Sequence, residues 1–177
     1  YFEKGMLLGD ETCKGELLYH QALVYEKKSD FASALGCLEA YASASALVEA
    51  ARKAAKRQSD SLLNYLCGED LDKINGRMVF QAAKAMDPAA VQVMEEFVEH
   101  LAVGVANIIN IFQPEVLCVG GGLSGAGDQL LTPLRERTAP VGYSRSSQKN
   151  ARIVAAALGN GAGIIGAAGL WEMGEGV

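Results

Sequence analysis

VLCVGGGLSGAG, at residues 116–127, joins four apolar residues directly to three consecutive glycines, Gly120, Gly121 and Gly122. A short apolar run bounded by turn residues is typical of a β-strand covered on both faces. Glycines that follow a strand let the backbone adopt conformations and close approaches that a Cβ would forbid. Their N–H groups, with the N-terminus of a helix near Asp128, would present donors to a phosphate. A tight loop without a ligand is the alternative, because glycine-rich turns punctuate many α/β sheets.

Composition limits the classes of protein to consider. The chain has 177 residues, enough for one good-sized core or for one lobe of something larger. It carries 16 Lys and Arg against 21 Asp and Glu, a net charge of −5, so we expect neither nucleic acid nor an anionic membrane surface as a partner. No run of about 18 apolar residues and no signal-like start is visible, so we expect a soluble, cytoplasmic protein. The spacing of the four cysteines is wide and irregular, which favours reduced thiols over disulfides.

Periodicity and turn residues predict a helix-rich α/β chain. Helices are predicted from near Cys37 through Arg57, from Ser59-Asp60-Ser61 through Leu66, from Asn75 or Gly76 onward, and over 88–112, 128–137 and 163–171. Strands are predicted over 16–25, 116–119 and 151–157. The 88–112 helix has apolar residues at intervals of three and four and is bounded by Pro88 and Pro114. The order helix, strand, helix, strand, helix in the second half argues for an α/β layer.

Three motifs occur in a fixed order: GCLEAYASASAL at 36–47, NIINIFQPEVLCVGGGLS at 107–124 and LGNGAGIIGAA at 158–168. In this combination the chain resembles the ROK family, which groups bacterial sugar kinases with sugar-responsive transcriptional repressors. It looks most like the glucokinases of that family, over about residues 16–172. The resemblance implies an actin-like ATPase (ribonuclease H-like) fold of two lobes, with sugar and nucleotide bound between them.

The resemblance covers the C-terminal lobe alone, a helix-rich α/β lobe with a small central sheet, here residues 16–177. Residues 1–15 resemble nothing in the family and stay unassigned. The family's N-terminal lobe supplies a phosphate loop and an aspartate that acts as general base, and neither motif is found here. A second glycine-rich phosphate turn, expected before Glu16, is also not found. The chain by itself is therefore expected to be an inactive part of an ATP- and Mg²⁺-dependent hexose kinase.

The resemblance also implies a sugar site and a nucleotide site. The family places a histidine seventeen residues before the last cysteine of a Cys-x-Cys-Gly-x-x-Gly-Cys-x-Glu motif, and His20 stands at that distance from Cys37. The closing glutamate of the motif, which bonds the sugar, matches Glu39. Another family glutamate falls at Leu17, with Glu16 one place away, so the role of Glu16 is open. The alternatives are a structural histidine at 20 and a helix N-terminal acid at 39.

The same motif holds a structural zinc in the family, with that histidine and three cysteines as ligands. Here the first two cysteine positions are Asp30 and Ala32, and a glycine position is Ser33. One cysteine and one histidine cannot complete a tetrahedral structural site, even if Asp30 contributes. Zinc is therefore not expected.

Three functions remain open at this stage. The first is the ATP-dependent sugar kinase, with glucose as the expected substrate. The second is the sugar-binding effector domain of a transcriptional repressor, which basic DNA-binding helices upstream would favour. The third is a degenerate lobe kept for assembly. A homodimer is also expected, because the apolar stripe of 88–112 and the Ala-rich helix after Glu39 exceed what one small lobe can cover, and because the family commonly forms dimers through this lobe.

Overall fold

Helices dominate the part of the chain that the computed structural model describes, which comprises residues 38–141, 150–158 and 164. The chain divides into two units, Tyr1–Gly104 and Val105–Val177. The predicted strand over 16–25 lies outside the described residues, as does the predicted helix over 163–171 apart from Ile164. Among the described residues, no helix combines the length and apolar composition needed to cross a bilayer.

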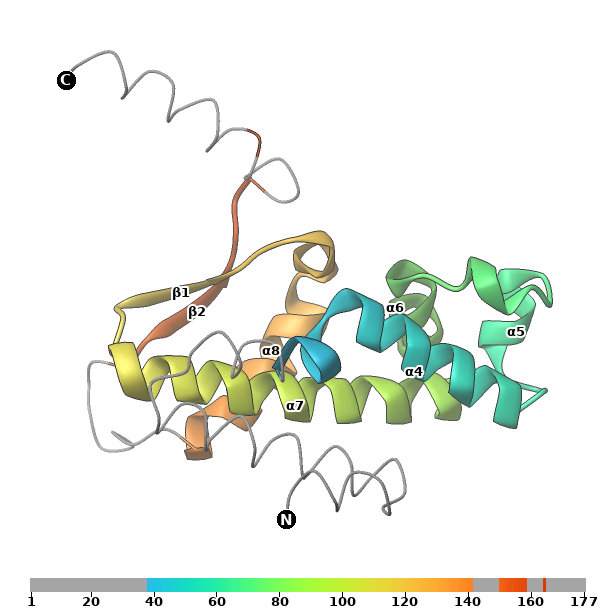
Figure 1. Cartoon of the computed structure of the whole chain (residues 1–177), viewed down its shortest axis with the longest axis horizontal. Helices are drawn as coiled ribbons and strands as arrows, with labels where there is room; N and C mark the ends of the chain where they lie inside the picture. The colour runs from blue at the N-terminus through green and yellow to red at the C-terminus, as the bar shows by residue number, and fades with distance from the viewer. Residues whose placement is uncertain (1–37, 142–149, 159–163, 165–177) are drawn as a thin grey trace. The chain divides into compact units, whose positions relative to one another are not determined.

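The first unit is built from short helices. After a helical segment at 38–42 come α4 (Ala44–Arg57), α5 (Leu62–Cys67), the 3-10 helix η1 (Leu71–Lys73), α6 (Gly76–Lys84) and the first part of α7 (Pro88–Phe112). The helices α4, α5 and α6 lie together (Figure 1). Their shared core consists of fully buried apolar side chains, including Leu47, Leu63 and Val79.

Ser43 divides what the sequence predicts to be one helix from near Cys37 through Arg57. Its backbone is extended (φ −91°, ψ 163°), and its side chain accepts a hydrogen bond from the N–H of Ala46 at 3.1 Å. Serine competes for backbone hydrogen bonds inside a helix and is favoured as an N-cap. The prediction of a continuous helix is therefore wrong at this residue, where 38–42 ends and α4 begins.

The other helices of this unit begin at residues whose side chains cap the first turn. Ser61 caps α5 and Asn75 caps α6, both as predicted. Asp87 precedes Pro88, the first residue of α7, and its side chain accepts from the N–H of Ala90 at 2.9 Å. Aspartate followed by proline is a favoured start of a helix, since the missing N–H of proline would have no intrahelical partner there. The predicted limits of α7, residues 88 and 112, are confirmed.

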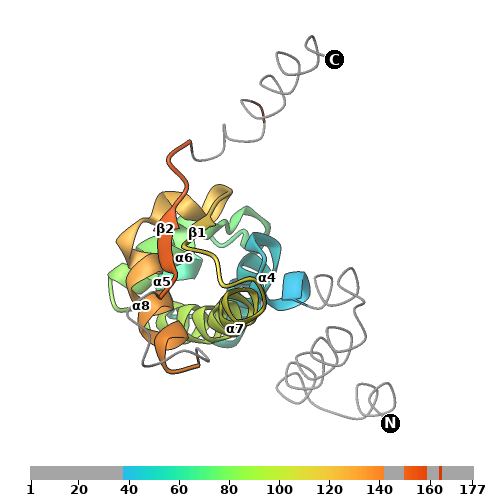
Figure 2. The same cartoon turned by 90° about the vertical axis from the view of Figure 1, so that its left-hand side faces the viewer.

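The second unit contains a parallel pair of strands and the helix between them. After the end of α7 come β1 (Val116–Val119), the 3-10 helix η2 (Gly122–Ala126), α8 (Asp128–Thr138), the 3-10 helix η3 (Ala139–Val141) and β2 (Arg152–Ala155). Strands β1 and β2 pair in parallel, with Val116 opposite Arg152, and they lie side by side next to α8 in both views (Figures 1 and 2). Leu130, Leu134 and Ile153 are buried.

The sequence predicts that β1 is covered on both faces, and for the described residues this is wrong. Val116 is 38% exposed and Cys118 is an exposed free thiol, while Leu117 and Val119 are half-buried. Exposure therefore alternates along the strand, as it does where one face of a sheet is packed and the other is open. The apolar run reveals the strand, but it does not reveal how many layers cover it.

Candidate functional site

The three glycines form a turn at the carboxyl ends of both strands. Gly120 follows β1 directly, and a Cβ on Gly120 would lie 3.8 Å from the Cβ of Ala156, the residue after β2. The sheet hydrogen bonds continue to this point, because the N–H of Ala156 donates to the carbonyl of Val119 at 2.9 Å. In open α/β sheets, ligands gather beyond the carboxyl ends of parallel strands. The turn thus lies at the edge where such folds bind their ligands.

Gly121 has a backbone conformation that requires glycine. Its φ of 76° and ψ of −167° lie in a region that residues with a side chain rarely adopt. Its carbonyl oxygen accepts two hydrogen bonds from Ser124, one from the backbone N–H at 3.2 Å and one from Oγ at 2.7 Å. A Cβ on Gly121 or Gly122 would meet no described atom within 4 Å. Ser124 therefore holds the shape of the turn, and no described atom fills the space where side chains at Gly121 and Gly122 would lie.

A short 3-10 helix that the sequence does not predict lies between the turn and α8, whose predicted start at Asp128 is confirmed. The residue that begins the next helix is Gly122, at the start of the 3-10 helix η2, and α8 begins six residues later at Asp128. The Asp128 side chain is 89% exposed and carries a negative charge into the first turn of α8. A carboxylate at that place disfavours a phosphate. The joint cradle of the three glycines and the α8 N-terminus stays a prediction, which this carboxylate opposes.

Arg135 joins α8 to the sheet that carries the turn. Its Nε donates to the carbonyl of Ile153 on β2 at 2.9 Å, and its Nη1 lies 3.8 Å from a carboxylate oxygen of Asp128. Neither Arg135 nor Ser124 was predicted to support the site. The sequence pattern around each residue is too common to indicate a role. Many loops have a serine shortly after glycines, and many helices have an arginine on their polar face.

Of the two predicted sugar-binding residues, the structure describes only Glu39. Glu39 is exposed and lies in the helical segment 38–42. His20, Glu16, Asp30, Ala32, Ser33 and Cys37 lie outside the described residues, so their predicted roles, and the expectation of no zinc, stay predictions. Within the described ranges, no group of three or more His, Cys, Asp or Glu side chains is placed to hold a metal ion. The thiols of Cys67 and Cys118 are free.

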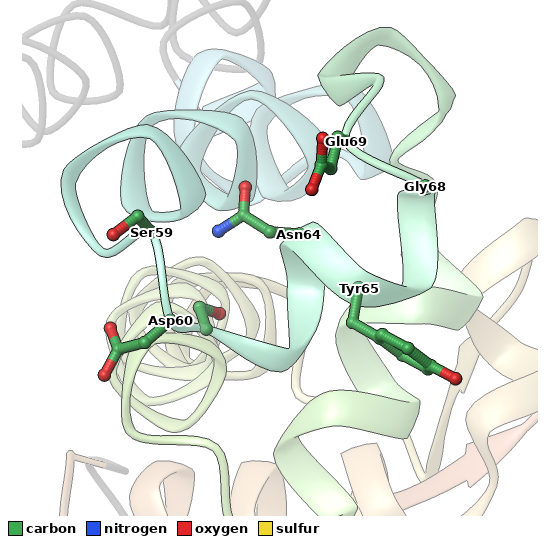
Figure 3. A pocket seen from close by; sticks show the side chains of 7 residues that line it. Ser59, Asp60, Asn64, Tyr65, Gly68 and Glu69 are labelled. Atoms are coloured by element: carbon green, nitrogen blue, oxygen red, sulfur yellow. The ribbon is translucent and has the colours of Figure 1, made fainter.

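An open hollow lies at the start of α5 in the first unit, lined by Ser59, Asp60, Ser61, Asn64, Tyr65, Gly68 and Glu69 (Figure 3). Tyr65, which is 83% exposed, points away from Ser59 and Asn64. The innermost polar groups already serve the fold, since Ser61 Oγ donates to Asp87 and Asn64 Nδ2 donates to the carbonyls of Ala55 and Gln58. No predicted site residue lines it.

A glycine turn at the carboxyl edge of parallel strands is the kind of site that α/β proteins use for phosphate-bearing ligands. The ROK family profile matches residues 21–173. A glucokinase from Thermotoga maritima is 40% identical over 136 residues, which are 76% of this chain and 42% of that protein. A xylose repressor from Caldicellulosiruptor bescii is 35% identical over 102 residues, which are 58% of this chain and 25% of that protein.

The structure is also similar to a solved one, that of a ROK family glucokinase from Streptomyces griseus in complex with glucose and AMPPNP. The TM-score is 0.70 at 34% sequence identity, over 76% of this chain and 44% of that one. This chain belongs to the ROK family and has the actin-like ATPase fold. It spans less than half the length of these relatives.

Proposed function

We propose that this chain is the C-terminal lobe of an ATP-dependent hexose kinase, with glucose as the hexose. The observation that carries the proposal is the structural likeness, at a TM-score of 0.70, to a glucokinase solved with both glucose and AMPPNP. The 40% identity to the Thermotoga maritima glucokinase supports the same activity. A homodimer in the cytoplasm, as expected from the sequence, is part of the proposal.

In this function the turn of Gly120, Gly121 and Gly122 binds the nucleotide. Three residues without side chains leave room for a purine or a phosphate against bare backbone, and the Gly121 backbone is held in shape by two hydrogen bonds from Ser124. ATP, with Mg²⁺ offsetting its charge, supplies the phosphoryl group for a sugar hydroxyl. No residue of this chain is assigned as a ligand of Mg²⁺.

Glu39 and His20 bind the sugar in the proposed kinase. A carboxylate accepts hydrogen bonds from vicinal hydroxyls, and an imidazole can both donate and accept. Glu39 is exposed on its helical segment and therefore accessible to a ligand. No residue of the chain is assigned as the general base. The 177 residues by themselves are thus expected to bind ligands without transferring phosphate.

A second function, the effector domain of a sugar-responsive repressor, is favoured by one observation. The Caldicellulosiruptor bescii xylose repressor matches 58% of this chain at 35% identity. A repressor domain would use the sugar site without needing a nucleotide, whereas the kinase needs both. The two functions therefore differ in whether the turn binds ATP or ADP.

The test is calorimetric titration of the two-lobed protein that contains this chain with ADP, glucose and xylose in the presence of Mg²⁺. For the kinase we expect ADP to bind with a dissociation constant in the range of about 1 μM to about 1 mM, as is usual for enzyme ligands, and glucose to bind in preference to xylose. Incubation of the chain with glucose and ATP should give no sugar phosphate above a control without protein. Sugar binding with no ADP binding would reject the kinase in favour of the repressor domain.

A further inference from the structure

Two contacts hold the helical segment 38–42 against α7 within the first unit. The Tyr41 and His100 rings pack with their centroids 5.3 Å apart at an angle of 56°. Leu38 lies over Gly104, whose missing side chain leaves room for it. The spacing is regular, because Leu38 and Tyr41 are three residues apart while His100 and Gly104 are four apart, and each spacing puts both members on one helix face. We refer to these four residues as the seam.

Gly104 is the critical member of the seam. It is buried, and an ideal Cβ built on it would lie 2.5 Å from Cδ1 and 2.7 Å from Cδ2 of Leu38, closer than real Cβ atoms come to other atoms. Its φ is not positive, so the turn conformations that favour glycine do not explain it. Glycine is also less favourable than alanine inside a helix. The packing of Leu38 is therefore the structural reason for glycine at this position.

Glu39 lies between two residues that contact α7, Leu38 and Tyr41. Leu38 and Tyr41 are both half-buried, whereas Glu39 is exposed. The direction of the Glu39 side chain therefore depends on how its neighbours are seated on α7. A hydrogen bond to a sugar hydroxyl is sensitive to such placement, because a shift of about 1 Å in a positioned group can cost up to about a hundredfold in function.

We propose that Gly104 is a positioning residue for sugar recognition, acting through Leu38 on the carboxylate of Glu39. This inference rests on the proposed function, since it requires that Glu39 bind a hexose. Gly104 itself touches no ligand in this proposal. A Cβ at 104 would make the Leu38 side chain shift, and in this proposal the shift alters the placement of the adjacent Glu39.

The experiment compares the wild-type two-lobed protein with its Gly104→Ala variant by calorimetric titration and by hydrogen exchange. We expect the glucose dissociation constant to rise by about tenfold and the ADP dissociation constant to stay within about twofold, because the glycine turn lies in the other unit. Amide exchange of a peptide covering 38–47 should become faster. The control is Gly125→Ala, since a Cβ there meets no described atom within 4 Å, and it should change none of these values.

A second variant makes the test specific to the contact. Leu38→Ala removes the Cδ atoms that the new Cβ would meet, so the double variant Leu38→Ala/Gly104→Ala should bind glucose about as well as Leu38→Ala alone. Equal losses from Gly104→Ala in both backgrounds would overturn the proposal.

The remaining outcomes separate the two proposals. If the wild-type two-lobed protein binds ADP and glucose, and Gly104→Ala leaves glucose affinity unchanged although 38–47 exchanges faster, the positioning role alone is overturned. Unchanged exchange at 38–47 would show that the seam does not hold the segment, and would overturn it as well. A wild-type two-lobed protein that binds neither ADP nor glucose would reject the proposed kinase itself, together with the positioning role.

Discussion

The two units of the molecule differ in the kind of group that fixes their structure. In the first unit, polar side chains connect separate helices through hydrogen bonds. Asp87 accepts three hydrogen bonds, and Arg52 donates to the carbonyls of Leu71 and Asp72 at 3.1 and 2.8 Å. In the second unit, the candidate site is formed by the backbone itself, through the strand ends and the positive φ of Gly121. Stability and ligand binding should therefore respond to different substitutions in the two units.

The Asp87 carboxylate is the most connected of these groups. Its Oδ1 accepts from Ser61 Oγ and from the N–H of Ala90, both at 2.9 Å, and its Oδ2 accepts from the N–H of Leu62 at 2.8 Å. Ser61 Oγ in turn accepts from the N–H of Leu63 at 3.2 Å. One buried carboxylate thus supports the first turns of both α5 and α7. Removing it would leave buried donors without an acceptor, which is costlier than losing a surface contact.

The largest expected effect is on stability, from Asp87→Ala. The free energy of unfolding should fall by about 3 kcal/mol, because two helix caps and a buried hydroxyl lose their acceptor together. Asp87→Asn keeps one carbonyl oxygen and should lose about half as much. Urea denaturation followed by circular dichroism measures both. The control is the exposed Asp60→Ala, and a loss at Asp87 no larger than at Asp60 would contradict the shared role of this carboxylate.

The second effect is on binding, from Gly121→Val in the other unit. Valine does not adopt the φ of 76° found here without strain, so the turn should change shape. We expect the ADP affinity of the two-lobed protein to fall by at least about tenfold, or about 1.4 kcal/mol, with the helical circular dichroism signal retained. Gly125→Ala is the control, since Gly125 lies outside the turn, does not have a positive φ, and an added Cβ there meets no described atom within 4 Å. Unchanged ADP affinity in a folded Gly121→Val variant would remove the turn from the nucleotide site.

The smallest effect is a pH dependence of the first unit, from His100. Burial lowers the pKa of His100 below 6.5, and the nearby charges of Glu96 and Glu99 oppose that shift in part. The folded state therefore prefers the neutral imidazole. Its contribution to stability is complete above pH 6.5 and is lost as the pH falls below that value, where the unfolded chain takes up the proton first.

His100→Phe tests this dependence while keeping an aromatic ring beside Tyr41. The midpoint of thermal unfolding should fall less in the variant than in the wild type between about pH 7.5 and about pH 5.5, the range in which histidine titrates. Equal shifts in both proteins would mean that other groups carry the acid sensitivity.

The sequence predicts the parts of the fold that depend on local patterns. The limits of α7, the caps Ser61 and Asn75 and the strand after Pro114 all follow from turn residues and periodicity, and the structure confirms them. The break at Ser43 was missed because a serine within an Ala-rich run is compatible with a helix, and only its hydrogen bond to Ala46 marks it as a cap. The exposed face of β1 was missed because burial depends on tertiary partners.

For the candidate site, the sequence identifies the glycines but not what holds them. Gly120–Gly122 are visible as a motif. The support from Ser124 is local but has no distinctive sequence signal, and the hydrogen bond from Arg135 to Ile153 on β2 forms only when residues 18 positions apart meet. Family resemblance assigns Glu39, but it gives no reason to notice Gly104, which is 65 positions away and lies against the neighbouring Leu38. The contact between Leu38 and Gly104 depends on packing between helices, which sequence periodicity does not predict.

The double contact of Asp87 has a consequence for the order in which the first unit folds. Its hydrogen bonds to Ser61 and Leu62 close a chain loop of about 25 residues, and a loop of this length costs conformational entropy before its contacts form. Neither helix start has its full set of hydrogen bonds until the other is in place. The segment from α5 to the start of α7 should consequently open and close as one cooperative foldon rather than fray helix by helix.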